Sequence, residues 1–203
     1  MTSPRARTAA FCERFGLRTP ILLGPMAGTP QTALPVAVAN AGGMGALGAL
    51  MLTPAQIAAW MRDFRAQSDG PCQINLWIPD PPPVRDAEAE ATMREFLGQW
   101  GPAVAENAGD AKLHDFAAQC DATLEARPAA ISSIMGVFPA EVVVHAKATG
   151  IAWFATATTL SEALQAEAAG ADAIIAQSFE AGGHRGAFDA ANAERHRTHR
   201  DVR

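Results

Sequence analysis

The chain has 203 residues, of which 49% are hydrophobic and 18% are charged, and its formal net charge is −5. This length and hydrophobic content are enough for one globular core, and they predict one domain or at most two. The mild acidic excess argues against nucleic acid as a partner, because binding to phosphates requires clustered Lys and Arg.

Short apolar runs alternate with helical patterns along the chain, and this alternation is typical of parallel βα units. A first strand is expected over 21–26, followed by a turn at 27–30 and a helix that ends near Asn40. Two glycines close that helix, and a second strand of small residues is expected over 44–50.

The helix after the second strand has the clearest signals. Thr53 is a suitable N-cap, Pro54 suits the first helical position, and Gln56 completes a capping box. The apolar residues that follow are spaced to form one stripe, and core packing explains this stripe better than metal or cofactor binding: Ile57, Trp60, Met61 and Phe64.

The remaining expected strands are 72–78, 129–135, 151–156 and 171–177, and the helices between them are 111–126, 139–148 and 159–170. The last of these helices begins with a second capping box, formed by Thr159 and Glu162. The segment 79–110 is a polar insertion with one helix over 87–99, and the prolines at its start cannot continue a strand.

This order of elements predicts an α/β fold of the TIM-barrel type, (β/α)8. A complete barrel has eight strands and typically about 250 residues. Only six strands are expected here, so we expect an incomplete barrel over 1–191, with 79–110 as an insertion off the barrel. The open edges of such a barrel favour self-association. We interpret 192–203, with its many Arg and His, as a basic, disordered tail from an out-of-frame or truncated gene product.

The cysteines and the hydropathy pattern bear on the compartment. Cys12, Cys72 and Cys120 lie far apart and lack CxxC spacing, so we interpret them as buried thiols in a reducing compartment and expect no metal site. No apolar run reaches the roughly 18 residues of a membrane span, and residues 1–15 lack the apolar core of a signal peptide. We therefore expect a soluble, cytoplasmic protein with no membrane partner.

Small and polar residues follow several expected strands at their carboxyl ends, where barrels of this type have their catalytic and binding residues. The segment 24–28, Gly-Pro-Met-Ala-Gly, either lets the backbone approach a flat ligand or forms a structural turn. Asn75 lies at the end of the third strand, and its amide either hydrogen-bonds a ring edge or is satisfied in the core. The segment 132–136, Ser-Ser-Ile-Met-Gly, is less specific.

The strongest motif follows the sixth expected strand, over 177–186, and reads Gln-Ser-Phe-Glu-Ala-Gly-Gly-His-Arg-Gly. Its glycines can present backbone N–H groups to an anion. His184 is the residue of this set that exchanges a proton near neutral pH. The alternative is an ordinary surface histidine in a flexible loop, and the surrounding pattern favours the functional interpretation.

These residues carry a family resemblance. The segment 177–186, together with Ala-Thr-Ala-Thr-Thr-x-x-Glu-Ala and Ala-Gly-Ala-Asp-Ala-Ile before it, resembles the nitronate monooxygenase family, also called 2-nitropropane dioxygenase-like. The turn at 25–28, Asn-Ala-Gly-Gly-Met-Gly at 40–45 and the strand around Asn75 are similar to earlier blocks of that family. The resemblance runs from about Thr19 to Ala191.

The resemblance implies an FMN-dependent enzyme that oxidises alkyl nitronates with O2, giving a carbonyl compound and nitrite. It implies His184 as the catalytic base or polariser. The residues that it implies at the FMN are Pro25, Met26, Asn75, Gln177, Gly182 and Gly183. The glycine-rich segments with which this family grips the FMN phosphate, after strands seven and eight, have no counterpart in this sequence.

Two alternatives stay open at this stage. The first is a catalytically inactive truncated remnant, or a subunit that needs a completing chain, and the missing phosphate loops favour it. The second is the related FMN-dependent enoyl-ACP reductase, which shares the barrel and the glycine–histidine loop. The reductase requires NAD(P)H, so an assay with pyridine nucleotides separates it from the nitronate-oxidising enzyme.

Overall fold

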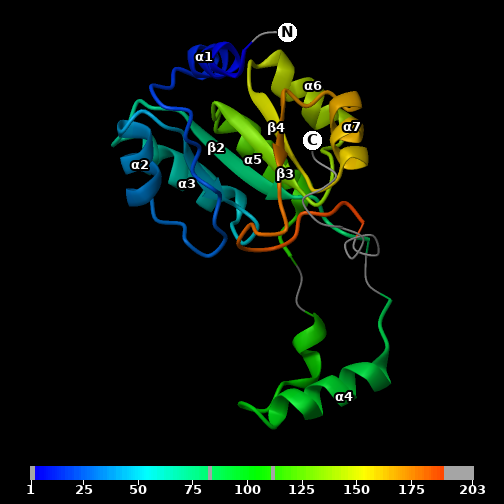
Figure 1. Cartoon of the computed structure of the whole chain (residues 1–203). Coiled ribbons are helices and arrows are strands. Elements are labelled where there is room, and N and C mark those ends of the chain that lie inside the picture. Colours follow the sequence, from blue (N-terminus) through cyan, green and yellow to red (C-terminus); the bar gives the residue numbers. More distant parts are fainter. Residues whose placement is uncertain (1–2, 82–83, 111–112, 190–203) are drawn as a thin grey trace. The chain divides into compact units, whose positions relative to one another are not determined.

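A parallel sheet of five strands is the centre of the structure, a computed structural model that describes residues 3–81, 84–110 and 113–189 (Figure 1). The strands are β1 (Gly45–Gly48), β2 (Cys72–Trp77), β3 (Ala130–Ile134), β4 (Ala152–Ala157) and β5 (Ala173–Ala176). Each strand pairs in parallel with the next along the chain. This order confirms the expected α/β fold of consecutive βα units.

The first expected strand, 21–26, takes the form of an isolated parallel bridge between Leu22 and Met44. The N–H of Leu23 donates to the carbonyl of Met44, and the N–H of Met44 donates to the carbonyl of Ile21, both at 2.9 Å. Pro25 has no N–H with which to extend this ladder. A bridged segment beside β1, rather than a regular strand, therefore stands where the first strand was expected.

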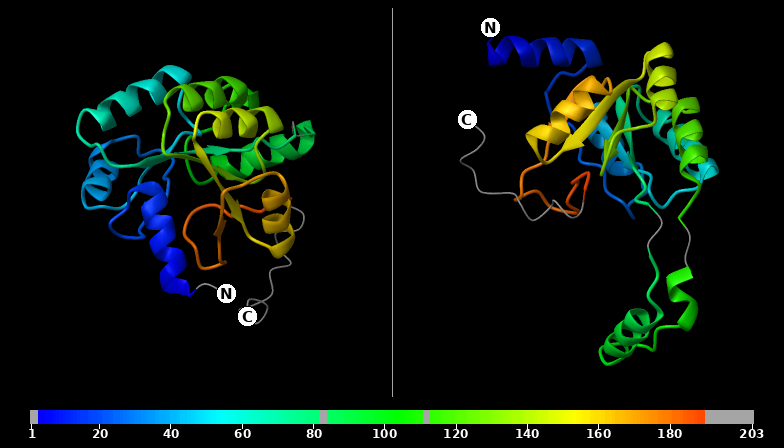
Figure 2. Two further views of the ribbon diagram at one scale, coloured as in Figure 1. Left: turned by 90° about the horizontal axis from the view of Figure 1, so that it is seen from above. Right: turned by 90° about the vertical axis from the view of Figure 1, so that its right-hand side faces the viewer.

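Apart from the N-terminal helix described below, the helices of the sheet unit are packed around the outside of the sheet (Figure 2). They are α2 (Ala33–Asn40), α3 (Pro54–Arg65), α5 (Phe116–Glu125), α6 (Ala140–Ala148) and α7 (Leu160–Ala168). Both expected capping boxes are present, at the starts of α3 and α7. Each box satisfies N–H groups that a helix start otherwise leaves without acceptors.

The main core lies between these helices and the sheet. The apolar stripe of α3 is buried as expected and packs against the outward-facing side chains of β2, which are Cys72, Ile74 and Leu76. Burial raises the pKa of the Cys72 and Cys120 thiols to about 12, so both stay protonated and unreactive near neutral pH. Cys12 is only partly buried, which differs from the expectation for all three cysteines.

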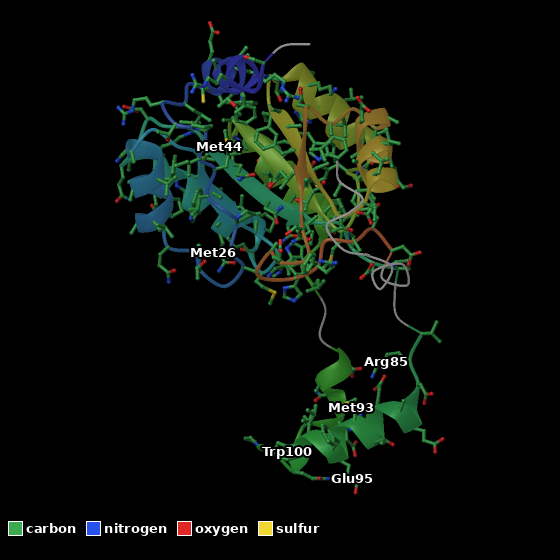
Figure 3. All side chains as sticks on the ribbon, viewed as in Figure 1. Met26, Met44, Arg85, Met93, Glu95 and Trp100 are labelled. Carbon is green, nitrogen blue, oxygen red and sulfur yellow. The ribbon has the colours of Figure 1, made fainter. Side chains whose placement is uncertain are left out.

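A helix that the sequence analysis did not anticipate, α1 (Pro4–Phe15), covers the amino-terminal end of the sheet. Its Phe11 and Phe15 pack with Phe154 of β4, with ring centroids 6.0 and 5.2 Å apart. Arg14 forms an ion pair with Asp172, at 2.6 Å, just before β5. Met44 lies at this end of the sheet and Met26 at the opposite end (Figure 3). The carboxyl ends of the strands are therefore at the end away from α1.

The described parts of Pro79–Leu113 form a second compact unit, separate from the sheet unit. It contains α4 (Ala87–Gly98) and a short 3-10 helix, η1 (Glu106–Asp110). Arg85 joins the two by ion pairs with Glu90 and Asp110. No helix in the described ranges is both long enough and apolar enough to cross a membrane. The expected tail, 192–203, lies outside the described residues.

Candidate functional site

The turn at 25–28 lies directly on the end of β1. A Cβ atom added to Gly48 would come within 2.8 Å of the Met26 carbonyl carbon and 2.9 Å of the Ala27 nitrogen. Only glycine leaves room for so close an approach of the two backbones. The sequence analysis did not single out Gly48, although the small residues of this strand were a usable signal.

Asn75 lies beside Gly48 in the sheet register and is buried, with 5% of its surface exposed. Its Nδ2 donates to the Oγ and the carbonyl of Ser132, at 3.1 and 3.2 Å, in the neighbouring strand. Its Oδ1 accepts no hydrogen bond from the described residues. Gly48, Asn75 and Ser132 thus form one row across three strands, with a free acceptor in the middle.

Gln177, directly after β5, closes the loop that follows. Its Nε2 donates to the carbonyl of His184 at 3.0 Å, and its Oε1 accepts from the N–H of Gly186 at 2.7 Å. A Cβ on Gly186 would lie 2.8 Å from the Ile134 side chain, so this part of the loop packs on the end of β3. One amide side chain therefore fixes the two backbone positions on either side of Arg185.

The closed loop brings His184 to the end of β2. The His184 ring lies edge-on to Trp77, with ring centroids 4.7 Å apart and an interplanar angle of 69°. Trp77 and Asn75 are two residues apart on one strand, so their side chains point to the same face of the sheet. The loop runs along the end of the sheet opposite α1, as the orange segment of Figure 1 shows.

Glu162, buried with 9% of its surface exposed, supports the far end of this loop. One carboxylate oxygen accepts from the N–H groups of Thr158 and Thr159 at the start of α7, and the other accepts from the N–H of Phe188 at 2.9 Å. Burial opposes the charge, but these hydrogen bonds prevail and hold the pKa of Glu162 below its usual range. The capping box identified Glu162 in the sequence, but its bond to Phe188 had no sequence signal.

The expected site residues are distributed as follows. Pro25 and Met26 belong to the turn on Gly48, while Gly182 and Gly183 lie exposed in the loop with open space around them. Gly183 has a left-handed backbone with φ 83°, which favours glycine. No hydrogen bond among the described residues joins Asn75 to Gln177 or His184. Ser133, in the segment 132–136, instead bonds the indole of Trp153 in the core.

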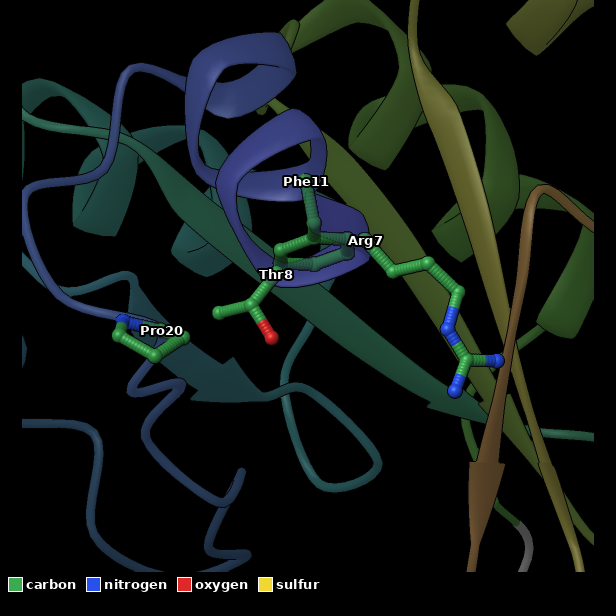
Figure 4. Close-up of a pocket in the computed structure, with 4 residues that line it drawn as sticks. All are labelled: Arg7, Thr8, Phe11 and Pro20. Carbon is green, nitrogen blue, oxygen red and sulfur yellow. The ribbon is translucent and has the colours of Figure 1, made fainter. Parts of the chain in front are cut away.

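A depression of about 350 Å³ lies elsewhere, between α1 and Pro20 (Figure 4). Its lining residues are Arg7, Thr8, Phe11 and Pro20. It is next to α1, which covers the amino-terminal end of the sheet, and so it is not part of the site around His184. The described residues contain no group of three His, Cys, Asp or Glu side chains that could hold a metal ion.

The parallel βα order, with helices outside the sheet, defines an α/β fold of the TIM-barrel type. The family model described as nitronate monooxygenase matches residues 10–202. The chain belongs to the nitronate monooxygenase family, a family of flavin oxidoreductases.

Named relatives agree with this assignment. The chain is 40% identical over 190 residues to nitronate monooxygenase of Paraburkholderia phytofirmans, covering 89% of this chain and 50% of that protein. It is 36% identical over 188 residues to nitronate monooxygenase of Pseudomonas aeruginosa, covering 90% of this chain and 53% of that protein. The chain therefore spans about half the length of these relatives.

Solved structures resemble the same region. Nitroalkane oxidase from Streptomyces ansochromogenes superposes with a TM-score of 0.75 at 30% identity, over 91% of this chain and 53% of that one. FabK from Thermotoga maritima superposes with a TM-score of 0.64 at 23% identity, over 87% of this chain and 46% of that one. The likeness to FabK concerns the fold alone.

Proposed function

We propose that this chain carries the active-site residues of an FMN-dependent enzyme that oxidises alkyl nitronates with O2 to a carbonyl compound and nitrite. The observation that carries the proposal is the closed loop 177–186, which holds His184 against Trp77 at the carboxyl end of the sheet. Family membership supports the reaction class.

The residues present suit a flat, anionic cofactor such as FMN. The turn on Gly48 leaves the Met26 backbone close to the strand end, and Asn75 offers a free Oδ1 acceptor. The N–H groups of Gly182 and Gly183 donate to no acceptor among the described residues, so they are available to an anion. We expect these groups, with Pro25, to hold FMN, and Gln177 to contribute through the loop that it closes. The flavin supplies the redox chemistry of the reaction.

His184 supplies the proton chemistry. An imidazole can take a proton from a carbon acid near neutral pH, which is the step that turns a neutral nitroalkane into a nitronate. His184 is exposed, with its ring edge-on to Trp77, so it can reach a small substrate at the strand ends. Gln177 fixes the backbone carbonyl of His184 and thereby limits where the ring can go. A substrate that is already a nitronate does not need this base.

The test compares the two substrate forms in the flavin-loaded protein, with nitrite release and O2 uptake as readouts. His184→Ala should lower turnover of a neutral nitroalkane by about 100-fold, the usual contribution of a general base, and turnover of the preformed nitronate far less. His145→Ala, at an exposed position on α6, is the matched control and should change neither. Equal losses on both substrates, or NAD(P)H-dependent reduction of an enoyl substrate in place of nitrite release, would refute the proposal.

A further inference from the structure

The carboxylate of Glu162 binds two separate parts of the chain. Its Oε2 accepts from the N–H and hydroxyl of Thr158, at 2.6 and 2.8 Å, and from the N–H of Thr159 at 3.1 Å. Its Oε1 accepts from the N–H of Phe188 at 2.9 Å. The first group starts α7, whereas Phe188 is the last residue of the loop 177–188, which carries His184.

Helix capping alone does not explain a carboxylate at this position. The equivalent box at α3 has Gln56, whose Oε1 accepts from the N–H of Thr53 at 2.8 Å. An amide has a single acceptor oxygen, which is enough for a cap. Glu162 uses both of its oxygens, and the second oxygen goes to the loop. The comparison separates the capping role, which Gln can fill, from the bond to Phe188, which needs the second acceptor.

The loop is held from two sides. Gln177 binds the backbone at His184 and Gly186, and Glu162 binds it at Phe188. Between these attachments, the His184 ring rests against Trp77. Gln177 is itself only half-buried and adjoins the edge strand β5, whereas Glu162 is buried and adjoins the well-packed strand β4. The Glu162 bond therefore attaches the loop to the more deeply buried part of the structure.

We propose that Glu162 is a positioning residue that fixes the loop 177–188 and so keeps His184 at the end of β2. The effect on turnover rests on the function proposed above for His184, whereas the effect on the loop does not. A charged acceptor contributes more to a hydrogen bond than a neutral one. The buried carboxylate is thus well suited to restrain a glycine-rich segment.

Hydrogen exchange of the whole chain, resolved by peptide, tests the attachment. In Glu162→Gln, the single amide oxygen can keep the cap of α7, and the amide NH2 then faces the N–H of Phe188 without an acceptor. We expect exchange in a peptide covering 177–189 to accelerate by about tenfold or more, as loss of a charged hydrogen bond implies. Peptides covering α7 should change little. Gln56→Ala is the control, and it should affect only peptides of α3.

A spectroscopic readout tests whether the loop positions His184. Contact with an imidazole quenches indole emission. The emission of Trp77 is the part of the tryptophan fluorescence that disappears in Trp77→Phe, and His184→Ala should raise it. Glu162→Gln should raise the same emission, and the double variant with His184→Ala should show no further rise. In the flavin-loaded protein, Glu162→Gln should also lower turnover of a neutral nitroalkane more than that of the preformed nitronate.

The outcomes separate the two proposals. Faster exchange confined to α7, or unchanged Trp77 emission in Glu162→Gln, would show that Glu162 only caps the helix and would overturn the inference. If exchange and emission respond as expected while His184→Ala leaves nitroalkane turnover unchanged, the positioning of the loop stands and the proposed function fails.

Discussion

The ring of His184 lies edge-on to Trp77, with the two ring centroids 4.7 Å apart. Trp77 ends β2 and His184 lies in the loop after β5. This contact therefore joins the second strand of the sheet to the loop that follows its last strand. Edge-to-face aromatic pairs are worth about 0.5–1.5 kcal/mol beyond the area that they bury. Such an energy is enough to favour one orientation of an otherwise exposed imidazole.

The first prediction concerns this contact. Trp77→Ala should lower turnover of a neutral nitroalkane by about two- to tenfold, because the His184 ring loses its 0.5–1.5 kcal/mol support. Trp77→Phe keeps an aromatic edge and should retain most of the activity. Trp100→Ala, at an exposed position in the second unit, serves as control. Steady-state kinetics on both substrate forms measure the effect, and equal behaviour of the Ala and Phe variants would exclude an aromatic contribution.

The parts of this structure that the sequence predicted are those with local causes. The capping box of Thr53 and Gln56 involves neighbours in the chain, and the apolar stripe of α3 repeats with the helical period. The βα alternation likewise predicted the order of the sheet. Each of these signals lies within one short window of sequence.

The contacts that the sequence did not predict join distant residues. Nothing near Phe188 indicates that its N–H meets Glu162, and nothing near Trp77 indicates that a histidine packs on it. The helix α1 had local signals in the Ser3 cap and in Gly16, whose φ is 65°, but its polar composition gave no apolar stripe. Its position follows from Phe11 and Phe15 meeting Phe154, which only the folded sheet makes possible.

A second prediction concerns the turn at 25–28. Gly48→Ala places a methyl group within 2.8 Å of the Met26 carbonyl carbon, so the turn must move away from β1. We expect FMN to bind at least about tenfold more weakly, because a displacement of this size removes backbone contacts worth more than 1 kcal/mol. Gly98→Ala, at the end of α4, is the control, since a Cβ there also meets nothing within 4 Å. Titration with FMN measures both, and unchanged affinity in Gly48→Ala would place the cofactor elsewhere.

A third prediction concerns pH and the attachment of α1. Burial works against the charge of Asp172, but hydrogen bonds from Arg14 and from the N–H of Trp153 hold the pKa of this carboxyl below its usual range. A carboxyl with a lowered folded-state pKa stabilises the fold above its unfolded pKa of about 3.9 and loses this effect as the pH falls through the folded value.

Asp172→Asn should therefore lower the free energy of unfolding at neutral pH, by about 1 kcal/mol or less because Arg14 is largely exposed. The difference from the unmodified chain should shrink as the pH is lowered below about 4. Urea unfolding at a series of pH values measures it. Asp121→Asn on α5 is the control, because the Asp121 carboxylate forms no ion pair among the described residues. A difference that grows on acidification would contradict the assignment.

The last strand of the sheet differs from the others in its burial. The strands β1 to β4 are almost wholly buried, whereas half-buried and exposed positions alternate along β5, and Ile174 is 38% exposed. Among the described residues, β5 pairs only with β4, so its other edge presents unpaired N–H and C=O groups. Such an edge is a template for another strand.

The fourth prediction follows from this edge. Joined to the C-terminal half of the Paraburkholderia relative, the chain should bind FMN at least about tenfold more tightly, because late βα loops of such barrels supply phosphate donors. The chain alone should associate at high concentration through β5, and Ile174→Lys, which places a charge on the edge, should reduce that association without restoring FMN affinity. Sedimentation and FMN titration measure the two effects separately. If the chain alone stays monomeric and binds FMN as tightly as the fusion, then β5 is not an edge that another strand completes, and the cofactor site is already whole within these residues.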